Sequence, residues 1–316
     1  MREPKLTEKQ KSRLKILEPK LKLAIEDRNI ESAISLTKDL QDLLKPTGNY
    51  NRLIQSKNRL YELAIDCDKI ELAINGLLSN RKVISENTRI HLEATALLAI
   101  AYLRKNDLDN AKPYIKEVLQ NDKVIKTDYR RIEFNSEIIQ RFDEEIAFAS
   151  LKDISTEKFT FEELEQDIIK TVQTHNEDEI YENIGRIIPG KSKYYLFQVH
   201  EYSLKQLPSA ERLLLPSPDQ KIKDGEMGKT VFQSLKRVVY NSICNPNSDI
   251  YKSWFNNGMQ IVLSKGYITA AVMSCFANLG IGIKSIIVWA VALIIKLGLE
   301  VYCERFKPKD LMNLRD

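Results

Sequence analysis

Residues 29–34 read NIESAI and residues 69–74 read KIELAI, and residues 107–112, DLDNAK, are a looser third copy of this pattern. A polar turn precedes each copy. The alanines of the copies are 40 and 38 residues apart in the sequence: Ala33, Ala73 and Ala111. A unit that recurs at this period predicts pairs of antiparallel helices stacked along the chain, because one pair cannot bury its own apolar face.

Each residue of the pattern has a physical role in such a pair. The apolar residue before the acid closes the turn, and the acid lies in the first turn of the second helix, where the helix dipole favours it. The alanine lets the two helices approach closely. Residues 10–150 also have few glycines and carry apolar residues at spacings of three and four, which is helical periodicity. We therefore predict a helical-repeat domain over residues 1–150.

The third copy resembles a tetratricopeptide repeat. The large apolar, small, aromatic and small positions of that family are matched by Leu98, Ala99, Tyr102 and Ala111. Lys123 stands where the family has its closing proline, and the first two copies match only at the turn and the alanine. The resemblance covers residues 15–125. It implies an α-solenoid that holds a peptide or a partner helix in its concave groove; the alternative is an irregular helical bundle.

A second feature is the apolar stretch of residues 266–303, whose first 18 residues, 266–283, carry no charge. Asn278, Gly280 and Gly282 predict a turn. We expect a helix on each side of that turn, over Tyr267–Phe276 and Lys284–Cys303. The residues selected in this hairpin are Val288, Trp289, Val291, Ile295 and Leu299. If the hairpin is core, Val288, Val291, Ile295 and Leu299 are expected to face the remaining C-terminal helices, including the one predicted at Lys229–Cys244.

Two interpretations of the hairpin remain open. A spanning helix needs about 20 mainly apolar residues, but the first helix is shorter and the second contains Lys296. The hairpin is therefore either the buried centre of a C-terminal helical domain, over residues 224–316, or an element stored for entry into a membrane. In composition alone it is similar to the hairpin of pore-forming bacterial toxins such as the colicins. The aromatic residues just before it, Tyr251, Trp254 and Phe255, suit either interpretation.

The middle region, residues 151–223, is predicted to be a helical connector. Thr160 and Glu163 form a capping-box pattern at the start of a helix that runs to Thr174. A shorter helix is expected over Glu177–Ile188. The proline-rich stretch of residues 207–223 is the predicted linker. The whole chain is thus predicted to be all-α, with a repeat domain, a connector and a C-terminal domain.

No residue pattern predicts a reaction. Residues 225–230 end in GKT as a P-loop does, but Lys223 stands where the motif needs its first glycine, and no apolar strand precedes it. We interpret the stretch as the turn before the helix at Lys229. His91, His175 and His200 do not pair at helical spacing. No catalytic, cofactor-binding or metal-binding residue is predicted.

Composition limits the partners and the compartment. The net charge is +4 and the charges are interspersed, with no long basic run, so no nucleic acid is expected as a partner. The four cysteines form no CxxC pair, which predicts free thiols in a reducing compartment. The first residues lack the apolar core of a signal peptide. We predict a cytoplasmic protein, with the inner face of a membrane as an alternative site through residues 266–303.

Three functions follow from these features. The first is a cytoplasmic scaffold or regulatory protein, not an enzyme, that binds a protein or peptide partner in the groove of its repeats. The second is a membrane-acting, pore-forming effector of a bacterial toxin or defence system. The third and most remote is a nucleotide-binding enzyme that uses residues 225–230. The sequence does not predict the oligomeric state.

Overall fold

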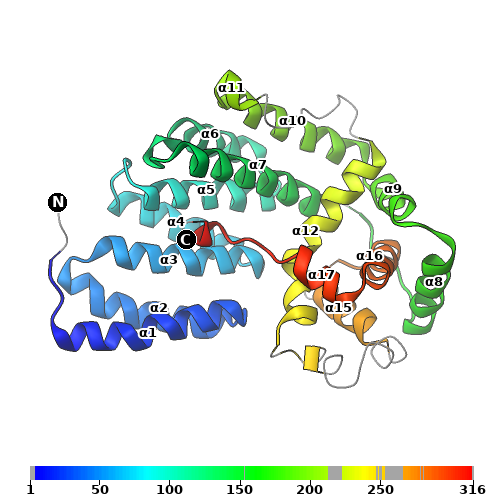
Figure 1. Ribbon diagram of the computed structural model, residues 1–316, viewed down its shortest axis with the longest axis horizontal. Helices are drawn as coiled ribbons and strands as arrows, with labels where there is room; N and C mark the ends of the chain where they lie inside the picture. Colours follow the sequence, from blue (N-terminus) through cyan, green and yellow to red (C-terminus); the bar gives the residue numbers. More distant parts are fainter. Residues whose placement is uncertain are drawn as a thin grey trace. The chain divides into compact units, whose positions relative to one another are not determined.

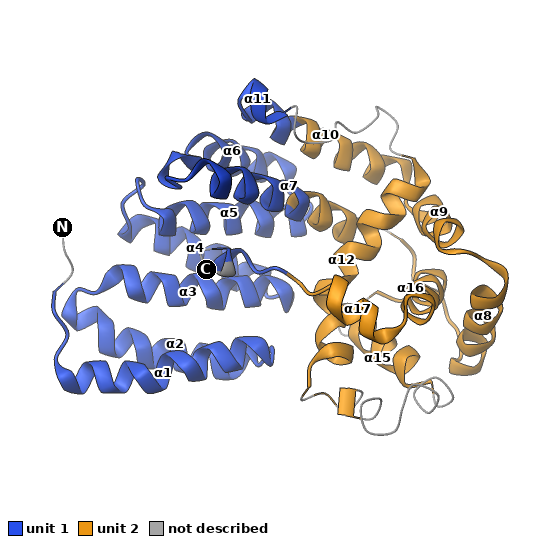
Figure 2. Ribbon diagram, in the orientation of Figure 1, with its two compact units in different colours: residues 1–141, 202–215, 309–316 blue, residues 142–201, 216–308 orange. Residues whose placement is uncertain are grey.

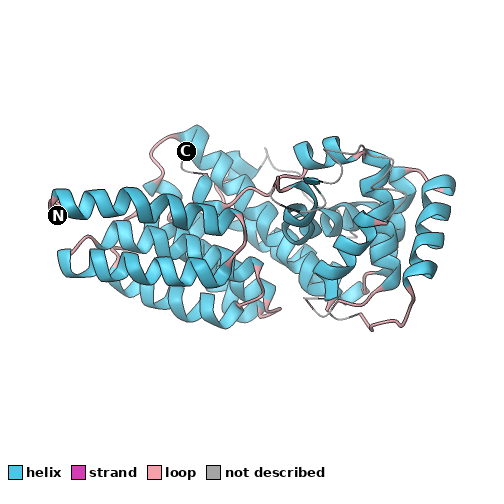
Figure 3. Cartoon of the chain, turned by 90° about the horizontal axis from the view of Figure 1, so that it is seen from below, coloured by secondary structure: helices cyan, strands magenta, loops and turns pink. Residues whose placement is uncertain are grey.

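The computed structural model of the chain describes residues 4–152, 154–212, 223–246, 248, 251–252, 266–277, 279 and 281–314. The described residues form helices joined by turns and contain no strand, which confirms the all-α prediction (Figure 3). Trp254 and Phe255 lie outside the described residues, as do Asn278, Gly280 and most of the predicted linker.

The helices follow one another as labelled in Figure 1. The first group is α1 (Glu8–Glu26), α2 (Ile30–Leu44), α3 (Tyr50–Asp66), α4 (Ile70–Val83), α5 (Arg89–Arg104), α6 (Leu108–Gln120) and α7 (Asp128–Leu151). The second group is α8 (Phe161–Thr174), α9 (Glu177–Ile187), α10 (Gly190–Gln206), α11 (Ser209–Arg212) and α12 (Asp224–Cys244). The last group is α15 (Tyr267–Ala277), α16 (Lys284–Leu297), α17 (Leu299–Arg305) and the 3₁₀ helix η3 (Leu311–Asn313).

The three sequence copies open α2, α4 and α6, and the turn before each helix has the same geometry. One residue of each turn has a left-handed backbone, with φ of 54° at Arg28, 58° at Asp68 and 61° at Asn106. The next residue donates its backbone N–H to a carbonyl five positions earlier: Asn29 to Ala24 at 2.8 Å, Lys69 to Ala64 at 2.7 Å and Asp107 to Tyr102 at 2.9 Å. This is the Schellman arrangement that satisfies the last carbonyls of a helix.

Packing follows the order of these helices. Each helix from α1 to α6 packs on the next one, and α1 also packs on α3, and α3 on α5 (Figure 1). Ala33, Ala73 and Ala111 have no exposed surface. A small side chain at these positions is what allows α2, α4 and α6 to pack closely on their neighbours.

The chain divides into two compact units, which differ from the predicted domains (Figure 2). Unit 1 comprises residues 1–141, 202–215 and 309–316, and unit 2 comprises residues 142–201 and 216–308. The boundaries at 141 and 201 lie inside α7 and α10, where the sequence has no break in helical pattern. The predicted boundaries at 150 and 223 follow local turns and prolines, which do not decide which helices share a core.

The core of unit 2 is built on α9 and α12, which pack along each other. Two glycines make their approach possible. A β-carbon at Gly185 would lie 1.8 Å from the Asp224 carbonyl oxygen, and one at Gly228 would lie 1.8 Å from the Tyr181 carbonyl oxygen. In the same unit, α8 begins with the predicted capping box, in which the Thr160 hydroxyl accepts from the backbone N–H of Glu163.

The apolar stretch forms α15, α16 and α17 in unit 2. The second predicted helix is shorter than expected because Gly298, with φ of 78°, separates α16 from α17. The apolar side chains of α16 pack mainly against α8 and α9, while α12 packs against α15 and α17. Val288, Val291 and Leu299 are buried, and Trp289 and Ile295 are partly exposed.

Whether a helix could cross a membrane depends on its length and its hydropathy. In the described part of the chain, no single helix is long and apolar enough to cross a bilayer. The pair α16 and α17 meets the same criteria only when taken together, with a bend of 100° between the two helices.

The cysteine prediction is wrong for two of the four residues. Cys244, the last residue of α12, forms a disulfide with Cys303 on α17, and Cys67 and Cys275 are free. The two partners are 59 residues apart, so only the packing of α12 and α17 brings them together. Because disulfides persist in oxidising surroundings, thiol content no longer supports a reducing compartment.

Candidate functional site

Residues 225–230, which end in GKT, lie in the first turns of α12. The helix begins at Asp224, and the prediction that it begins at Lys229 is wrong. Gly228 faces the backbone of Tyr181 on α9, so the space beside this glycine is filled by protein. Close helix packing accounts for Gly228 without a bound phosphate.

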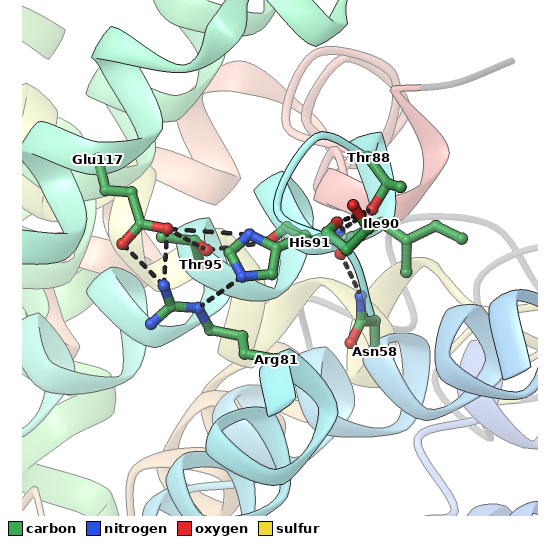
Figure 4. A network of polar contacts seen from close by, with 8 residues as sticks. Asn58, Arg81, Thr88, Ile90, His91, Thr95 and Glu117 are labelled. Carbon is green, nitrogen blue, oxygen red and sulfur yellow. Dashed lines mark hydrogen bonds and ion pairs between the residues drawn. The ribbon is translucent and has the colours of Figure 1, made fainter. Parts of the chain in front are cut away.

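A polar network joins α4, α5 and α6 in unit 1 (Figure 4). Arg81 on α4 donates to both carboxylate oxygens of Glu117 on α6, at 2.6 and 2.7 Å. The imidazole of His91 on α5 lies beside this ion pair, with Arg81 Nε 3.4 Å from His91 Nε2. The Thr95 hydroxyl donates to the His91 carbonyl at 2.9 Å. The network therefore ties three successive helices together.

The state of His91 fits a structural role. Burial and then the positive charge of Arg81 lower the pKa of His91, so its imidazole is neutral at pH 7 and Nε2 can accept from Arg81. The network continues to α3 through Asn58, which is fully buried and donates to the Ile90 carbonyl at 3.1 Å. Asn80 in turn donates to the Asn58 side-chain oxygen at 2.9 Å. These groups satisfy one another, as buried polar groups must.

The other two histidines lie in unit 2. His200 Nδ1 is 2.7 Å from a carboxylate oxygen of Asp143, and burial raises the pKa of Asp143 while His200 opposes that rise. The ring of His175 meets Trp289 edge-on, with centroids 5.1 Å apart. Among the residues that the structure describes, no group of three or more His, Cys, Asp or Glu is placed to hold a metal ion.

The candidate site is the place in unit 1 where residues 309–314 lie. This 309–314 segment includes η3, which packs against α3 and α5 (Figure 1). Leu311 and Met312 are 5% and 1% exposed, so both apolar side chains are buried although the segment is short. The hydrophobic effect therefore favours docking through Leu311 and Met312, with a smaller contribution from partly buried Leu314.

Glu62 on α3 holds the backbone of the segment. Its carboxylate accepts from the backbone N–H of Leu311 at 2.5 Å and from that of Met312 at 3.2 Å. Glu62 is buried, and burial raises its pKa well above the usual range, with the negative charges of Asp310 and Asp66 acting in the same direction. A carboxylate that accepts two N–H groups is the arrangement expected at the start of a helical turn, where these donors have no partner in the turn.

Two further contacts hold the ends of the segment. The Arg89 guanidinium on α5 donates to the Leu314 carbonyl at 2.9 Å, and fully buried Glu93 holds that guanidinium at 3.2 Å. At the other end, the Lys309 ammonium pairs with Glu137 on α7. α3, α5 and α7 thus each contribute a charged side chain that contacts the segment.

The charges around Asp310 oppose one another. Burial and then the negative charge of Asp66 raise the pKa of Asp310 to about 6, while the charges of Arg141, Arg28 and Arg59 lower it. Asp66, the last residue of α3, accepts from Arg141 on α7 at 2.7 Å. Docking of the segment therefore brings its own carboxyl group, Asp310, close to two further carboxyl groups, those of Glu62 and Asp66.

Sequence reasoning did not find these residues. Glu62 and Leu311 are 249 positions apart, and neither stands in a recurring pattern. The only local signal was a pair of apolar residues in a polar stretch after Pro308. The residues selected for the repeat lie elsewhere in the core: Leu98 and Ala99 are fully buried in α5, and Tyr102 stacks on Tyr114 at 5.7 Å.

Comparisons with known proteins do not assign the chain. No protein-family model, curated protein or solved structure matches it.

Proposed function

We propose that this protein binds a partner polypeptide on the face formed by α3, α5 and α7, and that α1–α6 are the tetratricopeptide-like pairs of a short solenoid. In such a solenoid, α1, α3 and α5 are the first helices of successive pairs. Two observations support the repeat part: the left-handed turn recurs at Arg28, Asp68 and Asn106, and the first helices contact one another in series.

The observation that carries the binding proposal is the docked 309–314 segment. This face holds a short polypeptide from a distant part of the chain by its backbone and by two apolar side chains, through Glu62 and Arg89. Backbone contacts recognise a segment in a defined conformation, and pockets for apolar side chains add selectivity, as in other modes of peptide recognition. A face built in this way can hold a segment from another chain.

A peptide of residues 307–314 tests this proposal. In full-length protein that carries Leu311→Ser and Met312→Ser, the resident segment lacks its apolar anchors and the face is open. We expect saturable binding of the labelled peptide, measured by fluorescence anisotropy. Glu62→Gln added to that protein should weaken binding about tenfold, because the glutamine amide keeps only one acceptor oxygen for the two backbone N–H groups, and a buried donor left without a partner costs about 1–3 kcal/mol.

Two controls make the result specific. A peptide with serine in place of the leucine and methionine should bind neither protein. Circular dichroism should show that the Glu62→Gln protein keeps its helical content. Absence of saturable binding by the open protein would reject peptide binding at this face.

The second candidate function, a membrane-acting effector, has one supporting observation: the apolar pair α16 and α17 meets the length and hydropathy criteria when taken together. The buried side chains of α16 weigh against it, because they would have to leave α8 and α9. Val291→Asp would place a carboxylate at a position with no exposed surface and should unfold unit 2. Liposome leakage caused by the wild type and lost in a Val291→Asp protein that still melts cooperatively would favour the effector.

A further inference from the structure

We propose that the 309–314 segment is an internal competitor of the partner, and that the partner presents the same chemistry: two consecutive apolar residues at the first turn of a helix. This inference rests on the proposed function, because it assigns the ligand and the regulation of the same face. The partner binds by displacing the segment, so the protein as described is in its closed state.

The geometry of Glu62 defines the partner's backbone. Its two carboxylate oxygens accept from the N–H groups of consecutive residues, Leu311 and Met312. Consecutive free N–H groups on one side of a chain occur where a helical turn begins, since the first donors of a helix lack carbonyl partners. An internal stretch of a helix, whose N–H groups are already bonded, would not satisfy Glu62. The partner therefore brings a helix start or a single turn to this face.

The side chains of the segment define the rest of the motif. Leu311 and Met312 are buried, so the partner presents apolar side chains at these two positions. Asp310 precedes them, but burial and the negative charge of Asp66 outweigh the positive charges of Arg141, Arg28 and Arg59 and raise its pKa to about 6, so an ionised acid is not required there. Lys309 is exposed, and its ion pair with Glu137 lies at the rim, where such pairs contribute little. A basic residue at the first position is thus not needed.

The same contacts show why the segment can be displaced. The segment contacts unit 1 through one short helical turn, two buried apolar side chains and a few polar contacts. The negative charge of Asp66 acts against an ionised Asp310, which further limits the strength of docking. What favours the segment is its covalent attachment, which gives it an effective concentration on the order of millimolar for a short flexible connection. A separate partner competes against that concentration.

The experiment compares three full-length proteins with one probe, the labelled peptide of residues 307–314. The proteins are the wild type, the Leu311→Ser/Met312→Ser variant and, as a matched control, Lys307→Ala, at an exposed side chain just before the segment. The apparent Kd of a protein whose open state is a minor fraction rises by the inverse of that fraction. We expect the wild type and Lys307→Ala to bind at least about tenfold more weakly than the double variant.

Hydrogen exchange provides a second readout on the wild type. The amides of Leu311 and Met312 should exchange slowly in the free protein, because both donate to Glu62. Saturating peptide should speed their exchange without changing that of the amides in α6. Faster exchange throughout unit 1 would instead mean general unfolding and would contradict displacement.

The outcomes separate the two proposals. Equal affinity of the wild type and the double variant would overturn competition and leave peptide binding at this face intact. No binding by any protein would reject the proposed function and the inference with it. Tenfold weaker binding by the wild type, with faster exchange at Leu311 and Met312, is the result expected from an internal competitor.

Discussion

Replacing Gly228 by alanine should separate α9 from α12. The added β-carbon would lie 1.8 Å from the carbonyl oxygen of Tyr181, 2.6 Å from its carbonyl carbon and 3.0 Å from its Cα. These are backbone atoms, which cannot turn aside as a flexible side chain can, so the helices themselves must move. Overpacking of a core costs about 1–3 kcal/mol, and a backbone clash belongs at the upper end of that range.

The intrinsic preference for alanine in a helix offsets part of this cost. Glycine in a helix interior is less favourable than alanine by about 1 kcal/mol. Subtracting that gain from about 3 kcal/mol of strain gives an expected loss of about 2 kcal/mol in the free energy of unfolding of unit 2. Gly225→Ala, three positions away in the same helix, is the matched control. Its β-carbon would meet only Glu182 Cγ, at 3.6 Å, which is an ordinary contact.

Urea denaturation followed by tryptophan fluorescence measures both variants, because Trp289 on α16 lies in unit 2 and reports its unfolding. Gly225→Ala should leave stability unchanged or raise it by up to about 1 kcal/mol. A Gly228→Ala protein as stable as Gly225→Ala would refute the argument that helix packing, and not a ligand, requires this glycine.

Three more predictions address the repeat, the disulfide and the charges at the segment. Ala33→Leu should cost about 1–3 kcal/mol by overpacking, while Ile34→Ala next to it, at a side chain that is 42% exposed, should change thermal stability much less; similar losses would contradict the assigned helix face. Reduction of the Cys244–Cys303 bond, which closes a loop of 59 residues, should lower the free energy of unfolding by about 4 kcal/mol on the chain-entropy model. Urea denaturation with and without reductant measures this loss, and a double serine variant is the control. A urea unfolding curve that reductant does not change would exclude this contribution. The pKa of Asp310 is raised to about 6 in the folded protein, so the stability that it contributes is complete below its unfolded pKa of about 4 and is lost as the pH rises through 6. Asp310→Asn should therefore flatten the fall in the free energy of unfolding between pH 4 and pH 7, measured by urea denaturation at each pH. Equal slopes for the wild type and Asp310→Asn would count against a raised pKa.

Some features of the fold are local and could be read directly from residues. Helical spacing, the recurring turn at Arg28, Asp68 and Asn106, and the capping box at Thr160 depend on neighbours a few positions away. The alanines of the repeat belong here as well, because a small residue at a fixed place after each turn predicts close packing wherever the next helix lies. Sequence alone therefore determined that the chain is helical and that the same turn recurs before α2, α4 and α6.

Tertiary structure decided everything that joins distant residues. The Cys244–Cys303 bond, the pairing of Gly228 with the Tyr181 backbone and the docking of Leu311 on Glu62 each depend on helices that meet only after folding. A glycine, a cysteine or a glutamate looks the same in sequence whether or not such a neighbour is present. The division into units has the same origin: continuous helices cross its boundaries at 141 and 201, because a helix is specified by local spacing, whereas a core is specified by which apolar faces cover one another.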